Sequence, residues 1–182
     1  RSAITAAKQL GQAIDLLLLG TEAESMTQQA AGLSGVTQVL VNAHACYDSL
    51  AENISQLIVA LAPAYDFILT PATSVGKDFL PRVAAKLNVS QISDVVQIID
   101  ANTFVRPVYA GNAIATVKSN DTIKMMTVRP TNFAAAATTG GGAAIKSVSV
   151  LGGASSTTFV SREQSKSERP ELTAARIVVS GG

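Results

Sequence analysis

The single histidine and the single cysteine of the chain stand two positions apart, at His44 and Cys46. In an extended segment this spacing places both side chains on one side of the backbone, where an imidazole could activate a thiol or share a metal ion with it. A structural zinc site needs four ligands, however, and a nucleophile needs a base that a third group orients. Because the sequence offers no further histidine or cysteine, we interpret His44 as a loop residue and Cys46 as a half-buried thiol.

A second candidate is the segment Val75-Gly76-Lys77-Asp78, which is similar to the end of a phosphate-binding loop. The full motif needs a glycine five positions before its Gly-Lys pair and a serine or threonine after the lysine. This chain has Pro71 and Asp78 at those positions, so the motif is absent. Lys77 and the free amides of a helix start could still bind an anion; the alternative is that Lys77 is only solvated.

Two further patterns are weaker. Gly140, Gly141 and Gly142 could form a backbone nest for a phosphate, but no predicted strand precedes them and no helix follows, so we interpret them as a flexible linker. Asp94 and Asp100 lack an apolar pocket that would separate their pKa values, as acid–base catalysis requires. We find no catalytic constellation, and we predict that the chain is not an enzyme and holds no metal.

The elements that must position these residues alternate between helix and buried strand. Thr21 and Glu24 have the spacing of a capping box, as do Ser49 and Glu52, and Pro81 should delay or kink the helix that contains it. The predicted helices cover residues 2–10, 21–31, 49–61 and 75–87, and the predicted strands cover residues 13–19, 36–41, 66–69 and 92–99.

This alternation predicts an α/β fold, a parallel sheet with helices on both faces, because parallel strands need crossover connections and helices usually supply them. Such a sheet normally begins with a strand that feeds the first helix through a right-handed crossover. We therefore expect one more strand ahead of Arg1. From residue 103 to 128, the turn pairs Gly111-Asn112 and Asn120-Asp121 predict short antiparallel strands that extend the sheet.

The last third of the chain changes in composition. Residues 134–167 are rich in alanine, glycine, serine and threonine, which predicts loops around at most one strand, near residues 147–151. Residues 175–179 are predicted to form a new strand that ends in Ser180-Gly181-Gly182, as nucleotide-binding domains often begin. We predict an N-terminal α/β domain over residues 1–170, and over residues 171–182 a linker and the first strand of another domain.

The overall composition narrows the class of protein. Hydrophobic residues make up 47% and charged residues 15%, which indicates a globular chain with a sizeable core. A net charge of +1 and an aromatic content of 4% argue against binding to nucleic acid. The apolar stretches are shorter than the roughly 20 residues of a membrane-spanning helix, and one cysteine cannot form an internal disulfide. We expect a soluble intracellular or organellar protein.

Four stretches carry a family resemblance: "SVGKDFLPRVAAKLNVSQISDVV" (residues 74–96), "FVRPVYAGNAIATVKS" (104–119), "TVRPTNFAAAA" (127–137) and "SERPELTAARIVVSGG" (167–182). In order and spacing they resemble the alpha subunits of electron-transfer flavoproteins. The resemblance runs across essentially the whole chain.

This resemblance implies a Rossmann-like fold of the adenine-nucleotide alpha-hydrolase type. It also implies a heterodimer with a beta subunit that holds one FAD, takes electrons from acyl-CoA and other dehydrogenases of fatty acid beta-oxidation, and passes them to a membrane quinone oxidoreductase. The family's flavin site would begin after Gly182, so we assign no flavin ligand within the chain and expect no bound cofactor. The implied location is the mitochondrial matrix or, alternatively, a bacterial cytoplasm.

Two functions follow as hypotheses. In the first, the chain is a scaffold domain whose sheet and antiparallel extension dock onto the beta subunit. In the second, it is a nucleotide-binding α/β module without a redox role, with the nucleotide at the carboxyl edge of the strands near residues 70–77.

Overall fold

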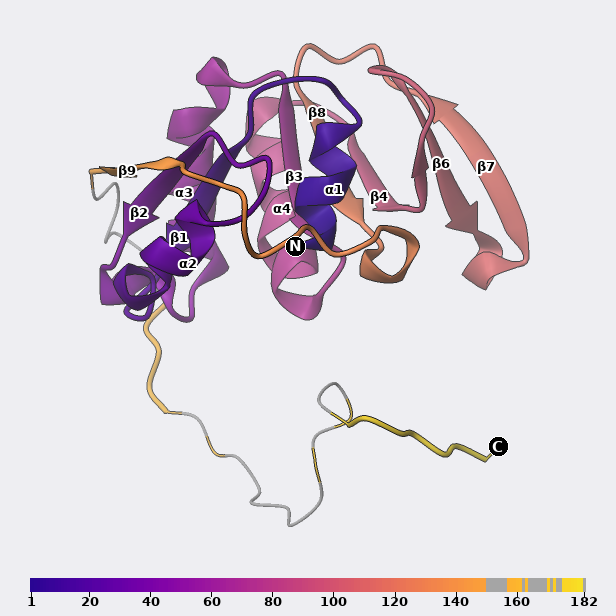
Figure 1. Cartoon of the computed structure of the whole chain (residues 1–182). Helices are drawn as coiled ribbons and strands as arrows, with labels where there is room; N and C mark the ends of the chain where they lie inside the picture. Colours follow the sequence, from indigo (N-terminus) through magenta and orange to yellow (C-terminus); the bar gives the residue numbers. More distant parts are fainter. Residues whose placement is uncertain (150–156, 162, 164–169, 171, 173–174, 182) are drawn as a thin grey trace.

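The computed structural model describes residues 1–149, 157–161, 163, 170, 172 and 175–181. Within these residues helices and strands alternate over the first half of the chain, as predicted (Figure 1). The α-helices are α1 (Ser2–Lys8), α2 (Thr27–Ala31), α3 (Ala51–Leu61) and α4 (Ser74–Leu87). The strands are β1 (Asp15–Leu19), β2 (Gln38–Asn42), β3 (Phe67–Pro71), β4 (Gln91–Val95), β5 (Gln97–Ile98), β6 (Thr103–Val108), β7 (Ala113–Lys118), β8 (Lys124–Val128) and β9 (Ala144–Ser147).

The parallel strands form two groups of three. In one group β2 lies between β1 and β9, and in the other β8 lies between β3 and β4. The centres of both groups are apolar, as is typical of parallel strands that are covered on both faces. Val39 in β2 and Met125, Met126 and Val128 in β8 are fully buried.

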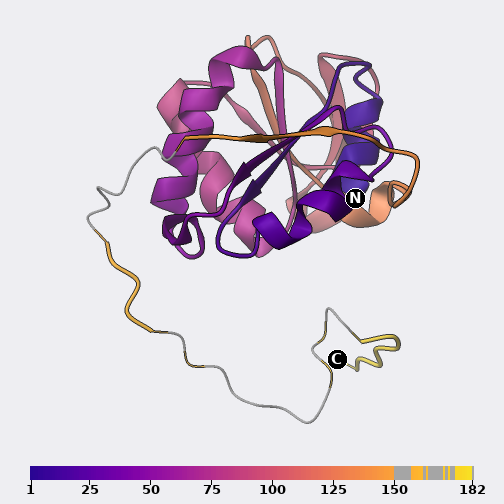
Figure 2. The ribbon, with the colours of Figure 1, turned by 60° about the vertical axis from the view of Figure 1, so that its left-hand side comes forward.

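Helices cover both faces of these strands, which confirms the predicted Rossmann-like α/β architecture. Along β8, Met126 packs on the side of α1 while Met125 packs against α3 and α4, because successive side chains of a strand point to opposite faces. Along β1, Leu16 and Leu18 face α1 and α2, whereas Leu17 faces α3 and α4. The two pairs of helices stand on opposite sides of the strands in the turned view (Figure 2).

The antiparallel extension consists of β5, β6 and β7, and the outer edge of β7 pairs with no other strand among the described residues. The prediction placed all strands of residues 103–128 in this sheet, and this was wrong for β8. That strand runs parallel to β3 and β4 and lies between them. The predicted strand over residues 92–99 is also divided, because a register shift between Ile92 and Val95 sends β4 and β5 into different sheets.

Several predicted boundaries differ from the structure. Neither predicted capping box forms: the amide of Thr21 donates to Asp48 Oδ1 at 2.7 Å, and α3 begins after Leu50 without a side-chain cap. The first α-helical residue of the second helix is therefore Thr27, after the short 3-10 helix η1 (Glu24–Met26). Pro81 does not delay α4, which begins at Ser74 because the Thr73 side chain accepts the amide of Gly76 at the helix start.

Two predictions concern the last part of the chain. The strand expected at residues 147–151 lies partly outside the described residues, and the strand that forms is β9, which ends at Ser147. Residues 175–179 do not form the predicted strand, because a strand needs a hydrogen-bonding neighbour and no described segment pairs with them. Gly182, the last residue of the predicted Ser180-Gly181-Gly182 ending, lies outside the described part.

Candidate functional site

The carboxyl ends of β1, β2 and β3 form the edge where ligands bind in open α/β sheets. Gly20 follows β1 with a φ of +96°, and a Cβ placed there would lie 2.4 Å from Asp48 Oδ1. The glycine lets the chain turn closely against the Asp48 carboxylate, which receives the Thr21 amide. The candidates His44, Cys46 and Lys77 all lie in loops or helix starts along this edge.

His44 and Cys46 form part of a structural turn. His44 is exposed, and its Nδ1 accepts the backbone amide of Cys46 at 3.1 Å, so the imidazole caps the 3-10 helix η2 (Ala45–Tyr47). Burial raises the pKa of the Cys46 thiol, which weakens it as a nucleophile. Asn42 and Asn53 hold the same turn, through bonds of 3.0 Å to the His44 amide and 2.8 Å to the Cys46 carbonyl. The interpretation of a loop histidine and a half-buried thiol is confirmed.

Lys77 lies in the first turn of α4 and is exposed. Thr73 already accepts the Gly76 amide, and the Thr73 carbonyl accepts the Lys77 amide at 2.9 Å. Part of the first turn is thus satisfied by the chain itself. Gly76 is required for packing, because a Cβ there would lie 2.2 Å from the Pro71 carbonyl oxygen. Lys77 is thus an exposed cation at the start of α4, where the amides of Gly76 and Lys77 are already bonded to Thr73.

The predicted flexible linker at Gly140, Gly141 and Gly142 is wrong. The Gly141 amide donates to the Gly32 carbonyl at 3.0 Å, and a Cβ on Gly141 would lie 2.3 Å from the Leu33 carbonyl oxygen. Gly141 therefore packs closely against the end of α2, and its amide satisfies a carbonyl group that a helix end leaves free. Because the Gly141 amide is bonded to Gly32, it is not free to bind a phosphate.

Asp94 and Asp100 occupy separate hydrogen-bonding settings and do not form an acid–base pair. Asp100 is exposed and accepts the Asn102 amide at 2.7 Å, which lowers its pKa. Hydrogen bonding and charge from Arg129 lower the pKa of Asp94. Both carboxyl groups are therefore ionised at neutral pH and cannot act as general acids there.

Asp94 is the centre of the most highly charged cluster on the edge, which the sequence reasoning missed. The Arg129 guanidinium donates from Nε to both Asp94 oxygens at 3.1 Å, and its Nη2 also contacts Oδ2. Lys77 and Arg106 lie near enough to lower the Asp94 pKa further. The Nε of Arg106 is buried and has no hydrogen-bond partner among the described residues.

The backbone at this cluster is also unusual. Asp94 has a φ of +60°, and its amide donates to Thr127 Oγ1 at 2.7 Å instead of to a strand partner. The Arg129 amide donates to the Val95 carbonyl at 2.9 Å. The pair Asp94–Arg129 thus fixes the point where β4 leaves the parallel strands for the antiparallel sheet. The repeated Val-Arg-Pro pattern around Arg106 and Arg129 is the sequence signal that could have indicated it.

A second candidate surface is the outer end of the antiparallel sheet. Tyr109 and Ile114, at the turn between β6 and β7 and on β7, are 82% and 64% exposed. In that turn Tyr109 and Ala110 have φ values of +52° and +54°. Positive φ costs free energy for residues other than glycine and is found disproportionately at functional surfaces. This turn presents a tyrosine ring beside an unpaired strand edge.

The described residues do not fit a flavin. Its pyrophosphate needs convergent amides or cations, and its ring needs an apolar cleft. An apolar cavity of about 580 Å³ lies between β1 and β3 and has one cationic side chain in its lining, that of Arg1. The Arg1 Nε already donates to the Ala136 carbonyl at 2.8 Å. Among described residues we also find no group of three or more potential metal ligands.

The helices of the described part are each too short or too polar to cross a lipid bilayer. The edge can thus hold an anion weakly at Lys77, and the antiparallel sheet can contact another protein. Neither arrangement contains a nucleophile with its base.

Comparison with known proteins gives a consistent assignment. The family model of the electron transfer flavoprotein domain matches residues 1–151. The chain is 49% identical over 180 residues to the electron transfer flavoprotein subunit alpha of Pseudomonas aeruginosa, covering 98% of this chain and 58% of that protein. It is 48% identical over 196 residues to the mitochondrial subunit alpha of Dictyostelium discoideum, covering 98% and 55%. For the Paracoccus denitrificans subunit alpha the identity is 45% over 181 residues, covering 99% and 58%. The chain spans a little over half the length of these relatives.

Proposed function

Because this chain belongs to the electron transfer flavoprotein family, we propose that it is the amino-terminal scaffold domain of an alpha subunit in a heterodimeric electron carrier. In this proposal residues 1–170 form the scaffold, and residues 171–182 lead toward a domain that binds FAD. The observation that carries the proposal is the match to alpha subunits over 98% of the chain. The lack of a flavin-shaped site among the described residues agrees with a scaffold role.

The proposed partner of the scaffold is the beta subunit, and the proposed contact is the antiparallel extension. Tyr109 and Ile114 give this surface large apolar side chains at high exposure, and aromatic residues are enriched at protein interfaces. The free edge of β7 provides backbone groups that a partner strand could pair with. A rigid backbone turn at Tyr109 and Ala110 would present these groups with little loss of entropy.

In the complete protein, FAD would supply the electron-carrying chemistry, and the residues of this chain would hold the two subunits together. The proposed donors are acyl-CoA and other dehydrogenases of fatty acid beta-oxidation, and the proposed acceptor is a membrane quinone oxidoreductase. The relatives include mitochondrial and bacterial proteins. We propose the mitochondrial matrix, with a bacterial cytoplasm as the alternative, and no catalytic role for the chain itself.

Binding to a purified beta subunit tests this proposal. We expect the chain to form a one-to-one complex, and Ile114→Asp to weaken it by about tenfold or more, because a charge would be buried at the contact. The matched control is Val75→Asp on α4, where a side chain of similar exposure, 62%, lies outside the antiparallel sheet. Equal losses for both variants, or equal affinity for Ile114→Asp and the unchanged chain, would contradict the proposed contact.

The second candidate function is a nucleotide-binding module, which the exposed Lys77 at the start of α4 favours. A phosphate would bind the remaining free amides and the Lys77 ammonium. Calorimetric titration with AMP and ATP tests it. A binding heat that is present in the unchanged chain and lost in Lys77→Ala would support a nucleotide site. The absence of binding heat at high nucleotide concentration would exclude this function.

A further inference from the structure

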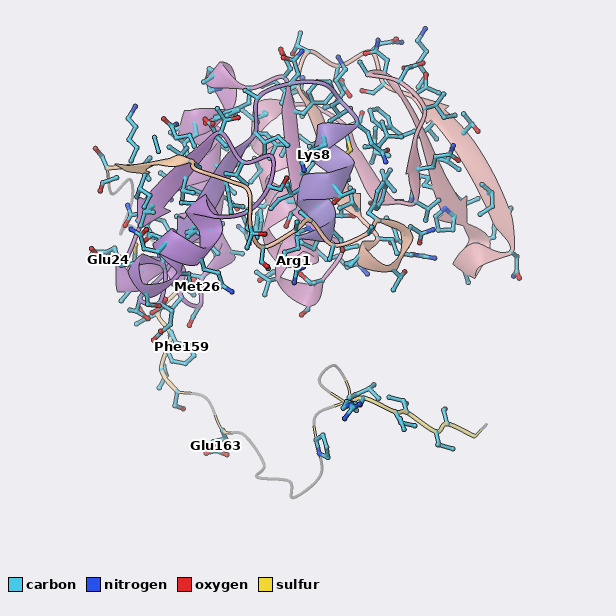
Figure 3. All side chains as sticks on the ribbon, viewed as in Figure 1. Arg1, Lys8, Glu24, Met26, Phe159 and Glu163 are labelled. Carbon is cyan, nitrogen blue, oxygen red and sulfur yellow. The ribbon has the colours of Figure 1, made fainter. Side chains whose placement is uncertain are left out.

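Most of the buried or half-buried cations in the described part of the chain have a partner within the chain, and Arg106 is an exception. Arg82 and Arg129 form ion pairs with carboxylates of neighbouring elements. Arg1 and Lys8, labelled at the two ends of α1 in Figure 3, donate to a backbone carbonyl and to a serine hydroxyl. The Nε of Arg106 is buried without a hydrogen-bond partner, and no described carboxylate forms an ion pair with its guanidinium.

An unpaired guanidinium is unfavourable at the position of Arg106. The residue is half-buried on β6, the central strand of the antiparallel sheet, and lies opposite Ala115 of β7. A charged donor that is buried without a partner loses hydration and gains no hydrogen bond in return. An arginine side chain also keeps its proton at physiological pH, so it cannot avoid this cost by becoming neutral. Arg106 therefore stands to gain more from an added carboxylate than a fully hydrated cation would.

A second arginine flanks the same peptide group as Arg106. The Val95 carbonyl accepts the Arg129 amide at 2.9 Å, and the Val96 amide donates at 2.9 Å to the carbonyl of Val105, the residue before Arg106. The carbonyl and amide of one trans peptide point in opposite directions. The backbones of the two arginines thus lie on opposite sides of this peptide, about two strand spacings or roughly 10 Å apart. Two arginine side chains can span that distance with a carboxylate between them.

The charges at this place do not balance. Hydrogen bonding and charge from Arg129, together with charge from Lys77 and Arg106, lower the pKa of Asp94. Three cations therefore act on one carboxylate, and this carboxylate is already bonded to Arg129. The cluster of Asp94, Arg129, Arg106 and Lys77, which we call the arginine cluster, has an excess of positive charge and attracts an anion.

The surroundings favour an acidic side chain of another protein over a small anion. Small ligands are mostly held in clefts that enclose them, but the cavities of about 330, 580 and 340 Å³ are lined by residues outside the arginine cluster. Asp94 and Arg129 are 25% and 41% exposed, so a partner would have to supply the cover. Arg106 also lies three positions before Tyr109, whose turn belongs to the proposed contact with the beta subunit. Arginine is enriched at protein interfaces and binds carboxylates through two parallel hydrogen bonds.

We propose that Arg106 and Arg129, with Lys77 beside them, form a binding site for a carboxylate side chain of the beta subunit. This inference rests on the proposed heterodimer and adds the chemistry of one contact within it. Arg129 remains bonded to Asp94, which holds it in place, and Arg106 is the unpaired cation that receives the incoming carboxylate. The exposed Lys77 adds attraction at longer range, which speeds the approach of an acidic surface. The site would supply a charged contact next to the apolar surface of the antiparallel sheet.

The affinity of Arg106→Met for a purified beta subunit tests the site, because methionine is long and flexible but has no charge. We expect the dissociation constant to rise by about tenfold or more, since the partner's carboxylate loses its ion pair in a partly desolvated place. Arg82→Met is the matched control. It makes the same change on α4, at an arginine that already pairs with Glu52, and should change the affinity by less than about twofold. Raising the salt concentration from about 0.05 M to about 0.5 M should weaken binding by the unchanged chain more than binding by Arg106→Met.

The stability of the free chain separates a binding role from a structural one. Because Arg106 has no partner among the described residues, Arg106→Met should leave the Tm of the free chain unchanged or raise it. Weaker binding by a variant of unchanged or higher Tm would support the site. A Tm that falls by more than about 4 °C would show that Arg106 stabilises the fold and would overturn the inference.

The remaining outcomes distinguish this inference from the proposed heterodimer. Equal affinities of Arg106→Met and the unchanged chain, or equal losses in Arg106→Met and Arg82→Met, would overturn the carboxylate site and leave the heterodimer standing. A failure of the unchanged chain to bind the beta subunit would overturn both. Inorganic phosphate, added to the free chain at constant ionic strength, is the probe for a small anion. A rise in Tm with phosphate that Arg106→Met abolishes would identify a small anion as the occupant and would also overturn the proposal.

Discussion

Replacing Asp94 by asparagine should destabilise the chain by removing one charge while keeping the shape of the side chain. The Asp94 carboxylate receives Nε and Nη2 of Arg129, and its φ of +60° is a conformation that asparagine also tolerates. Hydrogen bonds to charged groups contribute about 1.5–3 kcal/mol when well buried. The Asp94 and Arg129 side chains are 25% and 41% exposed. Solvent screening reduces the expected loss for Asp94→Asn to about 1 kcal/mol.

Asp94→Ala should lower the free energy of unfolding by about 1 kcal/mol more than Asp94→Asn does, because alanine is strained in the left-handed backbone conformation. The pH dependence separates charge from strain. The lowered pKa of Asp94 means that its ion pair stabilises the fold above the unfolded pKa of about 3.9 and that this contribution disappears as the pH falls through the folded pKa. The deficit of Asp94→Asn should therefore shrink toward zero in acid, whereas the extra deficit of Asp94→Ala should persist.

Urea unfolding followed by far-ultraviolet circular dichroism, at about pH 7 and below about pH 4, measures these differences. At neutral pH the loss for Asp94→Asn corresponds to a fall in Tm of about 2–4 °C for a domain of this size. Asp100→Asn is the matched control, because Asp100 is exposed and pairs with a backbone amide that asparagine can also bond. An Asp94→Asn variant as stable as the unchanged chain at neutral pH, or a deficit that acid leaves unchanged, would refute the reasoning.

The remaining predictions concern packing and one tyrosine. Gly76→Ala should destabilise α4 by about 1–3 kcal/mol despite the higher helix propensity of alanine, because its Cβ would meet the Pro71 carbonyl oxygen at 2.2 Å. Gly142→Ala has nothing within 4 Å and should change little; similar denaturation midpoints for the two variants would disprove the expected clash. Tyr65 donates its hydroxyl to Asp15 at 2.7 Å, and burial, together with that carboxylate, raises its pKa to about 12. The unchanged chain should therefore lose stability as the pH rises from about 10 to about 12, whereas Tyr65→Phe should be less stable below about pH 10 and should not show this loss; parallel pH profiles would contradict the assignment.

The sequence was sufficient to predict the alternation of helices and strands because burial on a parallel sheet leaves nearly continuous apolar runs such as residues 13–19. It could not place β8, since Asn120-Asp121 is a favourable turn in either topology and only the partners of Met125 and Met126 decide the direction of pairing. Glycine runs are similarly ambiguous. Gly140 to Gly142 could be mobile, nest-like or packed, and the contact of Gly141 with the end of α2 depends on chain that is distant in sequence.

The candidate site was less predictable than the fold. The sequence reasoning compared Asp94 only with Asp100, because its true partner Arg129 lies 35 positions away. Ion pairs between distant strands follow from register, and periodicity does not determine register. Conversely, the residue counts alone were enough to predict that His44 and Cys46 do not form a metal or catalytic site, because the chain has one histidine and one cysteine. The expectation of a further strand ahead of Arg1 came from connection rules and stays a prediction.

The central claim is that this chain is the scaffold domain of an electron transfer flavoprotein alpha subunit. Sedimentation of the purified 182-residue chain with a beta subunit, in the presence of FAD and with visible absorbance recorded along the boundary, tests it most directly. We predict that this chain and the beta subunit sediment together as a one-to-one complex. We also predict that this chain, when sedimented alone with FAD, carries no flavin absorbance. A chain that binds stoichiometric flavin by itself, or that sediments independently of the beta subunit, would contradict the claim.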